Sequence, residues 1–285
     1  MNRPRYRTLL GAALLFGMGG GPLWATTNSQ AGTSGVPFLK MEEGARPMCM
    51  GGAFTALADD VNSLWWNPAG IARSSFSEAS LSHTQFIENV TNEYVAFVRP
   101  LSDDYGAVGL SATYLTIPGV EGTDASGNST GELAARSWAG ALTYARQLVP
   151  GINFGTSFKL IGQKLAAQSG TGMAVDLGAQ YRYRQVSAGV AIQNLGPSFK
   201  IGGTSAPLPQ DFRFGVGYTP ISHLSMELDA EKARDADLKM RLGGEARLTP
   251  NFDLRAGYQQ MDNAGSGAGF TVGFSLKGLI GGPAQ

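Results

Sequence analysis

The chain has 285 residues, which is enough for one or two domains with a large buried core. Basic and acidic residues number 22 each, and this zero formal charge argues against a nucleic-acid binder, which needs a basic excess. Charged residues make up only 15% and glycines number 40, but an apolar content of 43% excludes a disordered chain. The one cysteine, Cys49, excludes an internal disulfide, and no cysteine–histidine cluster is present to hold zinc.

Residues 1–25 have the pattern of a secretory signal peptide. Arg3, Arg5 and Arg7 give a positive start, residues 9–20 form a short apolar stretch, and Ala25 is a suitable residue before the cleavage point. No later segment offers 18 uninterrupted apolar residues. We therefore expect an exported protein that is either soluble or spans a membrane as a barrel.

Residues 26–75 form an N-terminal segment, in which residues 36–75 show no alternation. Gly51 to Ala58 is small and helix-compatible, Asp59 and Asp60 are polar, and residues 65–70 end in a turn-like Asn-Pro. A compact segment of this kind ahead of a barrel is expected to lie inside it as a hatch or plug. A periplasmic appendage is the alternative.

From residue 76 to the end, apolar residues alternate with polar or small ones, as in strands with one apolar face. In the first two segments Leu81, Val95 and Phe97 fall on the wrong face. Most segments have the length that a tilted strand needs to cross a bilayer. The twelve predicted strands are 76–86, 91–101, 105–117, 134–148, 151–164, 171–184, 186–195, 210–219, 223–231, 238–248, 251–260 and 267–277.

Short and long connections alternate along this part of the chain. The longer ones are 118–133, 165–170, 196–209, 232–237 and 261–266. An outer-membrane barrel has tight periplasmic turns at one end and longer extracellular loops at the other. We therefore predict an all-β, transmembrane antiparallel β-barrel over residues 76–285, in the outer membrane of a double-membraned bacterium and with both termini periplasmic.

The predicted lumen face is rich in charges of both signs. An acidic strand lies between basic ones, so we expect cross-strand ion pairs that brace the wall, or else a polar wall lining a solute path. Arg46, Asp59 and Asp60 are candidates to dock the hatch on this wall. The ladder residues are Arg213, Glu227, Asp229, Glu231, Lys239, Arg241, Glu245, Arg247, Asp253 and Arg255.

Little in the sequence can carry chemistry. His83 and His223 each follow a serine, but adjacent residues on a strand face opposite ways, so neither pair can act together. The alternating acids at 227, 229 and 231 lie on one strand face instead of around a calcium-binding loop. We expect no enzyme, no metal and no cofactor, and Cys49 is expected to fill a small site in the hatch.

The N-terminal stretches Gly35–Lys40, Glu43–Arg46, Met50–Asp60 and Trp66–Ala72 resemble the first block of PorV/PorQ-type outer-membrane proteins. These are relatives of the FadL-type long-chain fatty-acid transporters. Asn194-Leu195-Gly196-Pro197 is also similar to that family. The resemblance implies fourteen strands and an N-terminal hatch, whereas this chain shows twelve strands and no terminal aromatic. The hatch residues that it implies are Gly51, Gly52, Asp59, Asp60, Asn67, Pro68, Ala69 and Gly70.

The resemblance implies a non-enzymatic component of type IX protein secretion, with secretion-system subunits and cargo proteins as partners beside the bilayer. The alternative is passive, FadL-like transport of hydrophobic small molecules. The first function needs protein-contacting extracellular loops, and the second needs an apolar pocket beneath them. A barrel with a mainly structural role is a third possibility.

Overall fold

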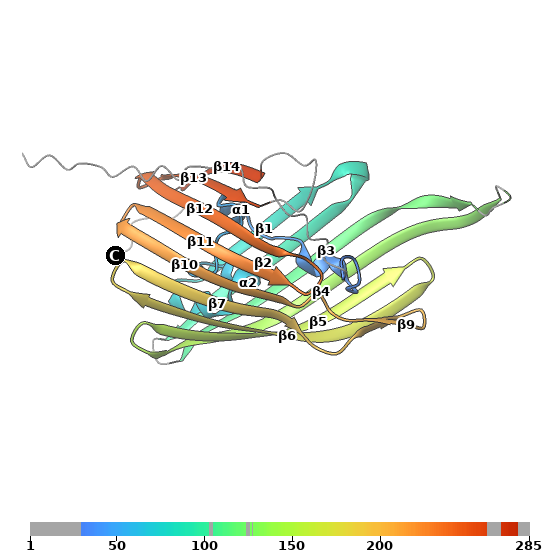
Figure 1. Ribbon diagram of the computed structural model, residues 1–285, viewed down its shortest axis with the longest axis horizontal. Helices are drawn as coiled ribbons and strands as arrows, with labels where there is room; N and C mark the ends of the chain where they lie inside the picture. The colour runs from blue at the N-terminus through green and yellow to red at the C-terminus, as the bar shows by residue number, and fades with distance from the viewer. Residues whose placement is uncertain (1–29, 103–104, 124–125, 127, 261–268, 279–285) are drawn as a thin grey trace, which may run out of the picture.

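The computed structural model describes residues 30–102, 105–123, 126, 128–260 and 269–278. The predicted signal peptide and the predicted loop 261–266 lie outside this range. Twelve strands form one antiparallel sheet in which each strand pairs with the next along the chain, apart from a small hairpin between the seventh and the eighth of them. The sheet curves into a barrel-like wall (Figure 1).

Most strands follow the predicted alternation, with apolar side chains outward and polar or small ones inward. Their bounds are β1 (Glu78–Gln85), β2 (Thr91–Ser102), β3 (Gly106–Thr123), β4 (Ser129–Val149), β5 (Ile152–Leu165), β6 (Gln168–Tyr183), β7 (Val186–Leu195), β10 (Asp211–Ile221), β11 (Leu224–Ala233), β12 (Leu238–Thr249), β13 (Phe252–Gln259) and β14 (Gly269–Leu276). The small hairpin is β8 (Phe199–Ile201) and β9 (Thr204–Ala206). The prediction of twelve strands is confirmed.

The wall is not closed. β1 and β14 are the two edges of the sheet, and among the described strands neither pairs with the other. β1 and β14 are each eight residues long, and their outward side chains are highly exposed, as Leu81 at 84% and Val272 at 74% show.

Two of the predicted long loops are wrong. Residues 117–133 are largely paired, since Val120 lies opposite Leu133 and Thr123 opposite Ser129, so β3 and β4 continue as a two-stranded ribbon. This ribbon projects past its neighbours (Figure 1). The connection from β5 to β6 is a tight turn at Ala166 and Ala167, with Leu165 opposite Gln168. Glycine and small polar residues in the ribbon masked its strand pattern in the sequence.

The concave side of the wall holds residues 36–75, which we call the internal segment. It contains four short helices: η1 (Pro37–Lys40), α1 (Ala45–Cys49), α2 (Ser63–Trp66) and η2 (Pro68–Arg73). A further turn, η3 (Ile87–Asn89), links β1 to β2. The blue helices lie within the curve of the sheet in Figure 1. The segment is thus not an appendage outside the barrel.

The internal segment explains why β2 is apolar on both faces. Tyr94, Ala96 and Val98 point inward and are buried against a cluster that includes Leu64 and Ile71. The outward residues of β2, which looked misplaced in the sequence, face the exterior as in the other strands. A lumen filled by protein needs apolar residues on the inner face as well.

The chain enters this structure at the end of the barrel that carries the longer connections. The Gly35 amide donates to the Pro207 carbonyl beside β9, and Lys40 pairs with Asp235 in the β11–β12 connection. The chain then runs through the lumen to the start of β1, and β14 ends beside Asn251 at the short-turn end. Residues 1–29 and 279–285 lie outside the described residues, so the prediction that both termini are periplasmic stays a prediction.

Candidate functional site: the internal segment and its contacts with the wall

The wall approaches the internal segment at backbone distance, because glycines line its inner face. A methyl group built on Gly155 would lie 2.4 Å from the Pro68 carbonyl carbon, and one on Gly257 would lie 2.1 Å from that of Met50. Methyl groups on Gly189 and Gly243 would likewise meet segment backbone, at Thr55 and Met50. Those on Gly109, Gly217 and Gly273 would instead meet the segment side chains of Leu64, Leu57 and Cys49. The inward glycines thus leave the space that the internal segment occupies.

Two carboxylates on β11 hold the backbone of the internal segment. Asp229 accepts from the amides of Phe54 and Thr55 at 3.1 Å each, and from the Thr55 hydroxyl at 2.7 Å. Glu227 accepts from the amides of Ala56 at 2.5 Å and of Leu57 at 2.9 Å. Both carboxylates are 1% exposed. Four successive amide groups are therefore satisfied by wall side chains instead of by a helix or a strand.

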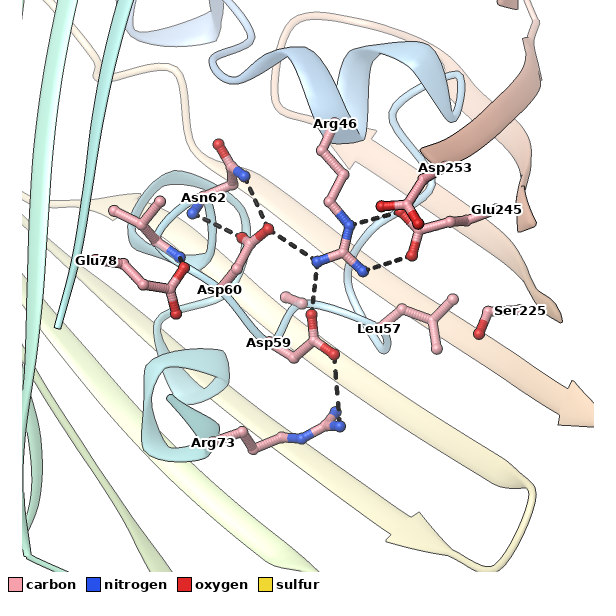
Figure 2. Close-up of polar contacts among 12 residues, drawn as sticks. Arg46, Leu57, Asp59, Asp60, Asn62, Arg73, Glu78, Ser225, Glu245 and Asp253 are labelled. Carbon is pink, nitrogen blue, oxygen red and sulfur yellow. Dashed lines mark hydrogen bonds and ion pairs between the residues drawn. The ribbon is translucent and has the colours of Figure 1, made fainter. Parts of the chain in front are cut away.

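Arg46 is the centre of an ionic cluster between α1 and the wall (Figure 2). Its guanidinium lies 2.7 Å from Asp59 and 2.8 Å from Asp60 on the segment, and it forms two bonds of 2.9 and 3.0 Å to Glu245 on β12. Arg73 approaches the other oxygen of Asp59 at 3.6 Å. One arginine thus joins two acids of its own segment to one of the wall.

The pKa values of this cluster follow from its geometry. Burial lowers the pKa of Arg46, but the carboxylates around it outweigh burial and hold that pKa well above its ordinary value. Burial raises the pKa of Asp59, but Arg46 and then Arg73 outweigh it, so that this pKa lies below its ordinary value. Both groups are therefore charged in the docked state over the whole physiological range.

Two further arginines face the tryptophans of α2. Arg213 lies 4.7 Å from the ring centres of both Trp65 and Trp66, which is within the range of cation–π contact. Arg241 pairs with Glu42 at 2.5 Å and donates to the Gly51 carbonyl at 3.4 Å. The wall charges therefore bind the segment through rings and backbone as well as through ion pairs.

The predicted ladder residues fall into two groups. Several pair along the wall: Arg213 with Asp211 and Glu231, Arg241 with Glu231, Arg247 with Asp253, and Arg255 with Glu245 and Asp253, while Lys239 lies opposite Glu231 in register. Glu227 and Asp229 instead bind segment amides, which the sequence pattern did not indicate. Their register neighbours Gly217, Gly243 and Gly215 were the available signal, since glycines opposite acids leave space for another chain segment.

The predicted hatch residues all lie in the internal segment. Gly51 and Gly52 have positive φ angles of 65° and 74°, and a methyl group on Gly51 would strike the backbone of Tyr258. Asn67 caps η2 by accepting from the Ala69 amide, and its side-chain amide donates to the Thr55 carbonyl at 2.7 Å. Pro68 begins η2, and Gly70 packs against Ser63 and Ala58. The motif thus fixes the shape of the segment and its fit to the wall.

An apolar cluster lies at the long-connection end of the lumen. The connection from β7 to β10, which holds β8 and β9, contributes Phe199 and Leu208, and the internal segment contributes Val36 and, from η1, Phe38 and Leu39. Inward residues of four strands complete it: Leu115, Ala139, Ile161 and Ala174. Lys159 and Asp176 form a 2.6 Å ion pair on the same wall. The cluster is the largest group of buried apolar contacts between the internal segment and the loops.

The described residues show no arrangement for catalysis. No group of three His, Cys, Asp or Glu among them is placed to hold a metal ion. His83 pairs with Glu93 on the outer face, and Cys49 lies against Gly273 of β14. Within the same described range, no helix is both long enough and apolar enough to cross a membrane.

A family model matches residues 25–207, which include the internal segment and the strands up to β9. The chain belongs to the uncharacterised protein family UPF0164. The UPF0164 protein of Treponema pallidum (strain Nichols) is 27% identical over 259 residues, covering 77% of this chain and 61% of the relative. The chain thus spans less than two thirds of that relative's length.

Solved structures share the fold of this UPF0164 member at low sequence identity. The Pseudomonas putida toluene transporter TodX covers 75% of this chain and 82% of its own, with a TM-score of 0.52 and 12% identity. The TodX deltaS2S3 mutant, a monoaromatic hydrocarbon channel, covers 85% and 86%, with a TM-score of 0.58 and 13% identity. The Ralstonia pickettii toluene transporter TbuX covers 76% and 86%, with a TM-score of 0.52 and 14% identity.

These similarities confirm a barrel of the kind that the FadL-type resemblance implies. The finer resemblance to PorV/PorQ proteins has no support from them. The named structures are described as transporters and channels.

Proposed function

We propose that this protein spans an outer membrane as a β-barrel and gives hydrophobic small molecules a passive route across it. The internal segment acts as the hatch of this route. The observation that carries the proposal is the buried apolar cluster that η1 of the internal segment forms with the wall and with Phe199 and Leu208 of the β7–β10 connection.

The outer surface supports the membrane placement. Large apolar side chains stand exposed along the outward face of strand after strand, including Leu142, Phe158, Phe214 and Leu242. A soluble monomer rarely exposes apolar patches beyond a few hundred Å². Aromatic side chains mark both borders of this band on β4, where Trp138 and Tyr144 point outward six positions apart. Such rings favour the bilayer interface.

The apolar cluster supports a hydrophobic solute. Its members are buried between the internal segment, the β7–β10 connection and the wall, so a solute that displaces Phe38 and Leu39 would occupy an apolar site at the long-connection end of the barrel. The toluene transporters that share the fold carry hydrophobic solutes, which agrees with this proposal. A secretion role has no comparable feature, because the projecting β3–β4 ribbon is short of apolar side chains at its tip.

The test is uptake of a radiolabelled long-chain fatty acid and of a monoaromatic hydrocarbon by cells that carry the protein in an intact outer membrane. Ile161→Glu places a charge in the apolar cluster and should abolish the protein-dependent uptake. Leu142→Ala, on the outer face, is the matched control and should retain it. Equal uptake by cells without the protein would contradict the transport function.

A pull-down from detergent-solubilised membranes separates the two functional classes. Apolar molecules without a stoichiometric protein partner are the expected result. Recovery of secretion-system subunits or cargo proteins in stoichiometric amounts would instead support the PorV-like role.

A further inference from the structure

The outer face of β1, β2 and β3 carries a groove of about 440 Å³. It lies on the membrane-facing side of the wall, because six of its nine residues are exposed on that side: Leu81, His83, Glu93, Val95, Ala112 and Tyr114. The alternate positions Ser82, Tyr94 and Thr113, whose side chains point inward, complete its lining.

The register of the sheet fixes the depth of this groove in the wall. His83 lies opposite Glu93, Glu93 opposite Tyr114, and Tyr114 opposite Trp138. These four outward residues form one rung, and the two aromatic rings place that rung at the bilayer interface. The histidine and the glutamate therefore lie at the level of lipid headgroups.

The next outward rung toward the middle of the barrel is apolar. Leu81 lies opposite Val95, and Val95 opposite Ala112. Ala112 is small and stands between larger side chains, which makes the depression. The groove is thus polar at headgroup level and apolar at the level of acyl chains, which is the arrangement of an amphiphile in a bilayer leaflet.

The polar end offers one group of each sign. His83 Nδ1 and Glu93 Oε1 are 2.6 Å apart, and the two side chains are 59% and 52% exposed. This contact uses one nitrogen of the ring and one oxygen of the carboxylate. The second ring nitrogen, Nε2, and the second carboxylate oxygen, Oε2, take no part in this contact. A ligand that carries both an anion and an N–H donor would match these two remaining groups.

We propose that this groove binds one phospholipid with a phosphoethanolamine headgroup. The ammonium group donates to Glu93, and the phosphate accepts from the Nε2–H of His83 in its imidazolium form, whose Nδ1–H donates to Glu93. An acyl chain lies over Ala112 between Leu81 and Tyr114. The site rests on the membrane placement proposed above, but not on the transport of any solute.

The test compares phosphatidylethanolamine with phosphatidylcholine of the same acyl chains, because the three methyl groups of choline remove every N–H donor. Native mass spectrometry of the whole protein in detergent counts the lipid that each preparation retains. We expect about a tenfold preference for the ethanolamine lipid, the effect of one hydrogen bond to a charged group.

Two variants and two matched controls locate the site. Glu93→Gln should reduce the headgroup preference to about onefold, since it removes the charge that the ammonium needs. Glu88→Gln, in the exposed turn η3 and outside the groove, should keep the preference. Ala112→Phe fills the groove and should lower retention of both lipids, whereas Ala256→Phe on the outer face of β13 should not.

Equal retention of the two lipids by the unaltered protein, or a preference that survives Glu93→Gln, overturns the proposal. Folding of each variant is checked by the heat-dependent gel migration of the barrel. Solute uptake is measured on the same variants, so that lost uptake with an intact lipid preference contradicts the transport function alone.

Discussion

Arg46 joins two acids of the internal segment, Asp59 and Asp60, to Glu245 of the wall. Arg46→Ala leaves three carboxylates without their common partner. Removal of one member of a buried ion pair costs about 3 kcal/mol. We expect the segment to detach more often, at a cost of that order.

Cys49 is a native cysteine, so this detachment can be measured without introducing another cysteine. It lies in α1, only partly exposed, and against Gly273 of β14. Alkylation of Cys49 by a maleimide should be clearly faster in Arg46→Ala, and unchanged in Arg136→Ala, which removes an exposed arginine elsewhere on β4. An unchanged alkylation rate in Arg46→Ala would show that the cluster does not hold α1 in place.

The same cluster predicts a dependence on pH. The folded-state pKa of Asp59 lies below the ordinary value of 3.8, so its ion pairs stabilise docking fully above that value. This contribution is lost as the pH falls through the lowered pKa, and it does not change between neutral and mildly acidic pH. Cys49 alkylation measured after brief acid exposure should therefore rise only below about pH 4.

Asp59→Asn is the control for the pH experiment. It should raise the alkylation rate at neutral pH and flatten the acid-dependent increase. An increase centred near pH 6 would point to another group, and would contradict the assignment to Asp59.

At the scale of the elements, the glycines of the wall decide how closely the internal segment fits. Gly155→Val on β5 would place side-chain atoms on the Pro68 backbone, where even a methyl group comes within 2.4 Å. Overpacking of this kind costs about 3 kcal/mol at the upper end of its range. We expect loss of the docked segment, measured as a lower midpoint of thermal unfolding in detergent.

Gly140→Val on β4 is the matched control, because nothing lies within 4 Å of a methyl group at that position. It should leave the midpoint unchanged or raise it slightly, since valine favours a strand. Similar losses in both variants would mean that glycine serves the wall itself instead of the fit to the segment.

The strands could be predicted from the sequence because their period of two is local and strong. Strand β7 was predicted with its exact bounds, and the ends of β5 and β10 differ by two residues or fewer. The β3–β4 ribbon was missed, because glycine, serine and threonine at residues 119–131 have no apolar face to alternate. A two-stranded ribbon that projects beyond the wall needs no apolar face.

The contacts of the internal segment could be predicted only in part. Arg46, Asp59 and Asp60 were recognisable as docking groups by their charge. The binding of backbone amides by Glu227 and Asp229 was not, because a backbone donor leaves no trace in the sequence. The sequence therefore predicted that the charged wall residues pair with one another, whereas Glu227 and Asp229 bind the internal segment.

At the scale of the whole molecule, the two ends of the barrel differ in a way that labelling can test. The proposed orientation places the β3–β4 ribbon outside the cell and the turn between β12 and β13 in the periplasm. In a Cys49→Ser background, Asn128→Cys marks the ribbon and Asn251→Cys marks the turn, and both positions are exposed.

A membrane-impermeant maleimide applied to intact cells should label Asn128→Cys and leave Asn251→Cys unlabelled until the outer membrane is permeabilised. The physical reason is that the exposed apolar band between the two positions can lie only in the bilayer, so the ends must face different compartments. Cys49→Ser alone controls for background labelling. The opposite pattern would mean that the barrel has the inverse orientation in the membrane. The apolar cluster would then lie on the periplasmic side, where it could not receive solutes from outside. Labelling of both positions in intact cells would contradict the placement of the barrel in the outer membrane, and therefore also the proposed transport route.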